Sequence, residues 1–447
     1  MRTDDDIELA AKPKSSKDGK YEAVATKNGK ASDAESEKKE LGYWGLSMSL
    51  LVMVLLWVAC IVLRYENIEW GSVECEMEDT DDIAESMCIR QNAIYRMTTV
   101  VGGFFALQAF IVLYNVVEIF DNFWVFVKIP LIILGTFCLI FFPSGYFDDS
   151  VFVWWARIGA FCFIIFQQII LLDFAYMWNS SWFNKHRSKN PMVRDTIDGS
   201  ECNMVCRSLW LVAILAVAAC LFAIFITGMS LLYKYYGGEG CSDSNTIITI
   251  SLLGMIGAGV VQLSSSNGSL LTTTVLMTYV AYITYASVSL NPKPECNPLA
   301  NNEDSGMGPA VIGLIISLLS MIYMSTITTR SVSALFSSGD ASAVVRGRSS
   351  GASSAPDLKK KLRKSVFLFN LVYAFLAMYL AMTMTNWGLR IRSLSTANTE
   401  TSNIGMWMQA SAAWVTIALY LVALISPIFK VIPDSVWDFY PTSITSS

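Results

Sequence analysis

The chain has few of the residues on which most enzymes rely. It has one histidine, His186, and charged residues make up only 15% of its 447 positions, whereas soluble domains usually carry about 25%. His186 lies between Lys185 and Arg187, and a solvated histidine beside two cations suits neither a base nor a metal ligand inside a membrane. The phosphate-binding pattern G-x-x-x-x-G-K-[ST] is absent from the sequence. We therefore expect a protein that is not an enzyme and hydrolyses no nucleotide.

Patterns for binding metals and nucleic acids are also missing from the sequence. Cys202 and Cys206 are four residues apart but have no further ligand nearby, and the acidic run 79–85 does not have the spacing of a calcium loop. The sequence contains no basic patch interleaved with aromatic residues. We expect no metal, no cofactor and no nucleic-acid partner.

Long apolar runs, in contrast, are abundant. Hydrophobic residues form 53% of the chain and the mean hydropathy is +0.46, which indicates a polytopic membrane protein. A bilayer is crossed by a helix of about 20 apolar residues. Runs of this length lie at 44–63, 96–118, 122–142, 151–173, 208–233, 244–263, 270–289, 309–328, 365–386 and 407–429. The predicted fold is an all-α integral membrane protein with ten transmembrane helices.

The run 270–289 is so rich in hydroxyl groups that an isolated helix would insert reluctantly. We expect it in the interior, where its polar face packs against other helices. Its hydroxyl side chains recur at helical spacing and favour interhelical hydrogen bonds over a substrate path. They are Thr274, Thr278, Tyr282, Tyr285 and Ser289.

The polar segments divide the chain. Residues 1–40 show no apolar periodicity and are predicted to be a disordered cytosolic tail. Residues 41–430 form the transmembrane domain, and 431–447 form a second cytosolic tail. The loop 330–364 is rich in Ser, Gly and Ala and ends in the basic run LKKKLRK, so we expect it to be disordered. The basic run either contacts anionic headgroups or serves only as a determinant of topology.

Lysine and arginine are distributed unequally between the two sides of the membrane. With the N-terminus inside, the cytosolic segments hold nine in 1–43, five in 174–207, eight in 330–364, and Lys430, against six on the opposite side. Cytosolic loops carry the excess of positive residues. Both termini are therefore predicted to be cytosolic, in an endomembrane or the plasma membrane.

The cysteines agree with this orientation. Cys75 and Cys88 share the first outer loop, while Cys241 and Cys296 lie in the third and fourth outer loops. Cysteines on an oxidising side form disulfides. We predict the pairs Cys75–Cys88 and Cys241–Cys296, with free outer thiols as the alternative.

The helix predicted over 154–182 is longer than is needed to cross the membrane. Its apolar run contains Gln167 and Gln168, with Arg157 before it and Asp173 after it, and it continues to Trp182 without proline or glycine. At about 1.5 Å rise per residue this helix is longer than the ~30 Å hydrocarbon core, so it must tilt or protrude.

Further charges lie at similar depths. Glu118 is at the cytosolic end of the run 96–118, and Lys128 lies two helical turns into the next run. A charge near mid-bilayer costs several kcal/mol unless it is paired or hydrated. One interpretation is structural: salt bridges, such as Lys128 with Asp173, hold the tilted helix. The other is a polar track for headgroups or a polar solute, with candidate residues Glu118, Lys128, Arg157, Gln167, Gln168, Asp173 and Asn179.

Five stretches, in order along about 44–430, resemble the serine incorporator family. They are FWVFVKIP with FFPSGYF (123–130 and 141–147), DFAYMWNSSW (173–182), NPKPECNP (291–298), LAMYLAMTMTNW (376–387) and SAAWVTIALYLVALISP (411–427). Members often begin with a cysteine-rich segment, whereas this chain opens with about forty polar residues and no cysteine.

The resemblance implies two helical bundles joined by a long tilted fourth helix, with lipid bound between them. It implies phospholipid handling: ATP-independent scrambling, support of serine incorporation into phosphatidylserine and sphingolipids, or both. The partners would be membrane phospholipids and lipid-synthesis enzymes; the oligomeric state is left open. A secondary transporter of a polar solute that uses Lys128 and Asp173, and a non-catalytic scaffold for lipid-synthesis enzymes, remain alternatives.

The charge distribution makes a prediction about topology. Protease added outside sealed, right-side-out cells should spare tags at the N-terminus and within 330–364, because the positive-inside rule places both in the cytosol. A tag in the first outer loop is the positive control. Digestion of the N-terminal tag in intact cells would overturn the orientation.

Overall fold

A computed structural model of the chain describes residues 47–64, 82–114, 122–141, 151–188, 201–264, 269–298, 307–344, 355–388 and 396–429. Every regular element within these ranges is a helix, as predicted. The helices are the N-terminal helix Ser47–Arg64, α2 (Asp82–Tyr114), α3 (Asn122–Ile140), α5 (Val151–Ser188), α6 (Glu201–Tyr236), α7 (Ser242–Ser264), α8 (Leu270–Val288), α9 (Met307–Val344), α10 (Ala355–Met384) and α11 (Thr396–Phe429).

The transmembrane prediction agrees with these helices. Nine helices in the described part of the chain are long and apolar enough to cross a membrane. The remaining predicted span, 122–142, falls on α3, which has a shorter described apolar part, Lys128–Leu139. The predicted tails 1–40 and 431–447 lie outside the described residues.

One helix begins well before its predicted start. The span predicted at 96–118 belongs to α2, which begins at Asp82. Arg96 does not end the apolar helix, because its side chain is buried and Nη1 donates a hydrogen bond to the Leu139 carbonyl near the end of α3, at 3.0 Å. A cation that binds the last carbonyls of a neighbouring helix can lie inside the protein.

The basic loop is also more ordered than predicted. Instead of disorder over 330–364, α9 continues to Val344 and α10 begins at Ala355, with 345–354 outside the described residues. Lysine, leucine and arginine are good helix formers. The basic run LKKKLRK therefore forms the first turns of α10.

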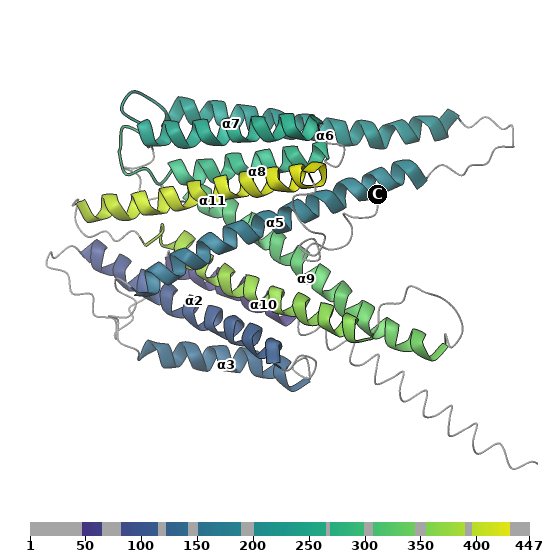
Figure 1. Ribbon diagram of the computed structural model, residues 1–447. Helices are drawn as coiled ribbons and strands as arrows, with labels where there is room; N and C mark the ends of the chain where they lie inside the picture. The colour runs from purple at the N-terminus through teal and green to yellow at the C-terminus, as the bar shows by residue number, and fades with distance from the viewer. Residues whose placement is uncertain are drawn as a thin grey trace, which may run out of the picture.

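The helices form two groups, each with its own hydrophobic core. The first draws its buried side chains mainly from the N-terminal helix, α2, α5, α9 and α10, and the second draws them from α6, α7, α8 and α11. Figure 1 shows α5 running diagonally between these two groups, and it packs on α9 and α10 on one side and on α6, α8 and α11 on the other. The two bundles and the connecting tilted helix are therefore confirmed.

The length of α5 accounts for this course. Its 38 residues extend about 57 Å at 1.5 Å per residue, far more than the ~30 Å hydrocarbon core. Because α5 crosses the membrane at a tilt, it meets helices of both bundles at successive depths.

The hydroxyl-rich α8 lies in the interior, as predicted. In the apolar 18-residue segment of α8, 72% of the residues are buried, against 11% in the corresponding segment of α6. Thr278 donates to the Leu221 carbonyl of α6, and Ser287 donates to the Met406 carbonyl of α11. Since its hydroxyl groups bond to neighbouring backbones, α8 is stable where an isolated helix of this composition would not be.

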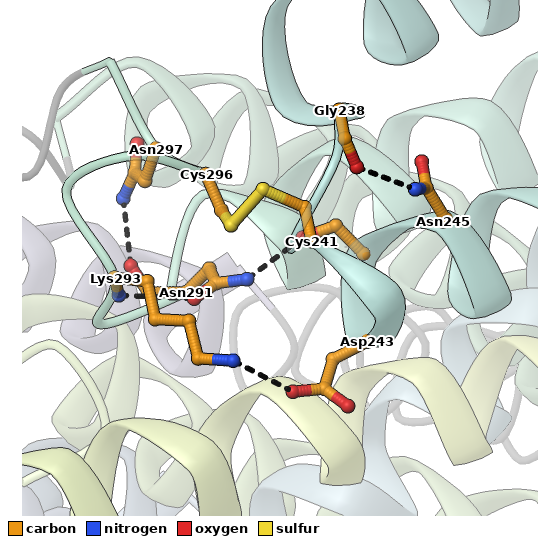
Figure 2. Close-up of a disulfide and its surroundings, with 9 residues drawn as sticks. Gly238, Cys241, Asp243, Asn245, Asn291, Lys293, Cys296 and Asn297 are labelled. Carbon is orange, nitrogen blue, oxygen red and sulfur yellow. Dashed lines mark hydrogen bonds and ion pairs between the residues drawn. A yellow bond between two sulfur atoms is a disulfide. The ribbon is translucent and has the colours of Figure 1, made fainter.

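A disulfide joins two loops of the second bundle (Figure 2). Cys241, just before α7, is bonded to Cys296 in the loop after α8, which confirms this predicted pair. Asn291 donates to Ser244 Oγ at 2.8 Å, and Lys293 forms a 3.9 Å ion pair with Asp243. Cys88 is also disulfide-bonded; Cys75, its predicted partner, lies outside the described residues.

Removing the Cys241–Cys296 disulfide should destabilise the second bundle. Loss of a native disulfide typically costs about 2–5 kcal/mol, so Cys241→Ser should lower the thermal unfolding midpoint of the purified protein in detergent. Cys220→Ser, at an exposed free thiol on α6, is the matched control and should leave the midpoint unchanged. Equal midpoints for both variants would show that the bond does not support the fold.

Candidate functional site

Four buried polar side chains follow α5 through the membrane, and we call them the α5 polar seam: Arg157, Gln167, Gln168 and Asp173. None is more than 8% exposed. Arg157 and Gln167 are about 15 Å apart along the helix, and Gln167 and Asp173 about 9 Å. The seam therefore supplies polar groups near the start, the middle and the later part of the span.

Near the start of α5, Arg157 binds a strained turn. Its Nε and Nη2 donate to the Trp387 carbonyl at 3.3 and 3.0 Å, and its guanidinium lies 5.2 Å from the ring centre of Trp154. Asn386, Trp387 and Gly388 have φ values of 47°, 61° and 81°, a left-handed conformation that costs about 1–3 kcal/mol at each non-glycine residue. The two bonds from Arg157 help to hold this turn at the end of α10.

A small cavity lies beside this turn, between α5, α8, α9, α10 and α11. About 40 Å³ of it is accessible to the centres of water molecules, enough for ordered water. Hydroxyl and amide side chains provide its polar lining, which includes no charged residue: Tyr279, Tyr282, Ser289, Tyr379, Thr383, Asn386 and Gln409. Its chemistry suits neutral hydrogen-bonding groups.

In the middle of the seam, Gln167 connects both bundles. Its Oε1 accepts a 2.8 Å hydrogen bond from the Tyr279 hydroxyl of α8, and its Nε2 donates to Ser317 Oγ of α9 at 3.2 Å. The adjacent Gln168 is equally buried, yet neither its amide nitrogen nor its amide oxygen has a hydrogen-bond partner among the described residues. A buried amide without a partner costs about 1–3 kcal/mol.

Farther in, Asp173 is held by α9. The Tyr323 hydroxyl donates to Oδ2 at 2.7 Å, while Oδ1 is buried and has no hydrogen-bond partner in the part of the chain that the structure describes. The predicted salt bridge with Lys128 is wrong: Lys128 Nζ donates to Ser49 Oγ of the N-terminal helix at 3.1 Å. Depth alone suggested the pair, but α3 packs on α2 and not on α5.

Two candidates remain. Glu118 lies outside the described residues, and Asn179 is half-buried near the end of α5. Among the described residues, no group of three or more His, Cys, Asp or Glu side chains is placed to bind a metal. The seam offers a guanidinium, two amides and one carboxylate, which suit the binding of polar groups.

Sequence reasoning missed the partners of the seam, which are Tyr279, Ser317 and Tyr323. Each is a hydroxyl residue within a predicted span. Tyr279 does not belong to the hydroxyl stripe identified on α8, although Tyr282 of that stripe makes an interhelical bond to the Pro309 carbonyl. A polar residue in a predicted span was the available signal, but it does not show which helix the residue faces.

Comparison with known proteins finds similarity along most of the chain. The model of the family described as serine incorporator (Serinc) matches residues 30–434. Serine incorporator 3 of Bos taurus is 26% identical over 407 residues, which cover 78% of this chain and 81% of that protein. A probable serine incorporator of Nematostella vectensis is 24% identical, over 85% of this chain and 88% of its own length. Serine incorporator 5 of Macaca fascicularis is 24% identical, over 81% and 92%.

Two tyrosines form a matched test of the seam. Tyr279→Phe removes the donor to Gln167 Oε1 and should lower the free energy of unfolding by about 1–3 kcal/mol, because a buried acceptor loses its hydrogen bond. Tyr373→Phe should cost little, because the buried Tyr373 hydroxyl has no hydrogen-bond partner among the described residues. Thermal unfolding in detergent measures both, and equal midpoints would argue against a structural role for the Gln167 bond.

Proposed function

Because the chain belongs to the serine incorporator family of multi-pass membrane proteins, we propose that it moves phospholipids between leaflets without nucleotide hydrolysis, along the α5 polar seam. The role is one of lipid handling rather than catalysis. The orientation belongs to the proposal: the lysine and arginine distribution favours cytosolic termini, so Arg157 lies toward the outer leaflet and Asp173 toward the cytosolic leaflet.

The single observation that carries this proposal is the buried, unpartnered amide of Gln168 at the middle of a helix that has polar groups on either side of it. A headgroup that crosses the hydrocarbon core loses its hydration, which costs several kcal/mol for a charged group. Polar groups at intervals of about 9–15 Å along α5 replace part of that hydration. Gln168 supplies both a donor and an acceptor at the depth where the cost is highest.

Lipid also has access to α5. Trp155 and Ile158 near the outer end and Phe174 near the inner end are each more than 40% exposed. In a membrane such apolar side chains contact acyl chains. A lipid can therefore keep its tails in the hydrocarbon while its headgroup follows the polar side chains of the seam.

The alternatives receive less support from the geometry. A relay through Lys128 and Asp173 is not assembled, because these residues bind different helices. The cavity beside α5 has no charged lining residue, so it offers no counter-charge for the ammonium and carboxylate of free serine. Support of serine incorporation into phosphatidylserine and sphingolipids would then follow from lipid redistribution, or from a scaffold role that brings lipid-synthesis enzymes together.

Reconstitution in liposomes tests the proposal. With a fluorescent phospholipid in both leaflets and a quencher outside, vesicles that contain the protein should lose the inner-leaflet signal without ATP. Gln168→Leu should slow this loss about five- to tenfold, because one hydrogen bond of about 1–1.5 kcal/mol is removed from the path. Gln108→Leu is the matched control: Gln108 is buried on α2, which packs on α10 and α3, and the change should leave the rate unaltered.

Other outcomes would exclude the proposal. Uptake of labelled serine by the same vesicles without lipid movement would favour a transporter. Absence of both activities would leave the scaffold. Equal slowing by Gln168→Leu and Gln108→Leu would mean that the loss reflects general destabilisation and that the seam is not the path.

A further inference from the structure

The cytosolic part of α5 combines a buried carboxylate with a row of aromatic rings, which we call the inner aromatic row: Phe174, Trp178, Trp182 and Tyr323. Phe174 lies 5.3 Å from Tyr323 and 5.9 Å from Trp178, and Trp178 lies 5.3 Å from Trp182, all between ring centres. The three members on α5 are spaced four residues apart, so they form one stripe on its surface. The stripe ends beside Asp173.

The carboxylate is incompletely satisfied. Asp173 is 8% exposed, and Tyr323 occupies Oδ2, while Oδ1 has no hydrogen-bond partner among the described residues. No described cation forms an ion pair with it: Lys128 binds Ser49, and Arg157 is about 24 Å away along the helix. A carboxylate at this depth needs a donor or a cation, and here one has to come from outside the described residues.

We propose that Asp173 and the inner aromatic row bind an ammonium cation of the kind carried by the choline, ethanolamine and serine headgroups of phospholipids. Aromatic faces attract such cations, and a carboxylate supplies the counter-charge. Phosphate would be repelled by Asp173. A divalent metal needs several oxygen ligands, whereas the site offers one carboxylate.

The depth of Asp173 suits a headgroup from the cytosolic leaflet. Gln167 forms a hydrogen bond with Ser317, and Asp173 forms one with Tyr323. The two bonds are six positions apart on both helices, so α5 and α9 run side by side in the same direction here. Tyr323 is five residues from the end of the span of α9 at Thr328, which is about 8 Å. The ammonium group of an inner-leaflet lipid can cover that distance while its tails stay in the hydrocarbon.

The end of the inner aromatic row next to Asp173 is exposed on the protein surface. Phe174 is 41% exposed, whereas Asp173, the preceding residue, is 8% exposed, so the row reaches the protein surface next to the buried carboxylate. This site is the cytosolic entry to the α5 polar seam, and in that role it rests on the proposed function. Binding of an ammonium group is measured separately from lipid translocation.

Calorimetric titration of the whole protein in a maltoside detergent tests the site. The probes are short-chain phosphatidylcholine, short-chain phosphatidylglycerol, which has the same glycerophosphate but no ammonium, and choline chloride. Phosphatidylcholine should bind at least tenfold more tightly than phosphatidylglycerol. Asp173→Asn keeps an acceptor for Tyr323 but removes the charge, and should abolish most of that tenfold preference.

A second variant keeps the test decisive if Asp173→Asn does not fold. Trp178→Leu should weaken phosphatidylcholine binding several-fold. Trp407→Leu, at a tryptophan on α11 that is 39% exposed, is its matched control and should leave binding unchanged.

Each result has a defined meaning. Choline that binds as tightly as phosphatidylcholine would support the ammonium site with a soluble cation as its ligand. Equal affinity for the two lipids, or unchanged selectivity in both Asp173→Asn and Trp178→Leu, would overturn the site. Ammonium selectivity without lipid movement in liposomes would reject only the proposed function, and lipid movement without this selectivity would reject only the site.

Discussion

The polar side chains of α5 need hydrogen-bond partners inside the hydrocarbon core, where there is no water. The packing of the two bundles around α5 depends on where these partners lie. Hydrocarbon cannot hydrogen-bond, so each polar group that enters it needs a protein partner. Gln167 finds its partners on α8 and α9, and Arg157 finds its acceptor at the end of α10. Because these partners belong to different bundles, the bonds that make α5 stable in the membrane also hold the two bundles together.

Cations in this protein are paired in a distinctive way. Arg64 donates to the Met384 carbonyl, Arg96 to that of Leu139 and Arg157 to that of Trp387. Each acceptor lies at or near the end of a helix, where carbonyl groups lack intrahelical partners and carry partial negative charge. Each of these bonds gives one guanidinium nitrogen an acceptor and gives a carbonyl at a helix terminus a donor. Asp173 accepts instead from the Tyr323 hydroxyl.

The groups that remain unsatisfied are as informative as the bonds. Gln168 and one oxygen of Asp173 are buried without hydrogen-bond partners among the described residues, at a cost of about 1–3 kcal/mol each. The adjacent Gln167 has hydrogen-bond partners in Tyr279 of α8 and Ser317 of α9. Neighbouring helices can therefore satisfy a glutamine at this depth. Gln168 and Asp173 differ from other buried groups without partners, such as the Tyr373 hydroxyl, because they lie on the helix that packs on both bundles. Exceptions to local satisfaction in a packed fold tend to mark functional positions.

The helical class, the spans, the interior position of α8, the exceptional length of α5 and the Cys241–Cys296 disulfide could be predicted from the sequence. They follow from local hydropathy, from length against bilayer thickness, and from the assignment of two cysteines to the same side of the membrane. The packing of the helices was needed to show that Lys128 meets Ser49 rather than Asp173, and that Tyr279, Ser317 and Tyr323 face α5. A hydropathy pattern gives the depth of a residue in the membrane, but the direction in which its side chain points around the helix depends on which helices pack beside it.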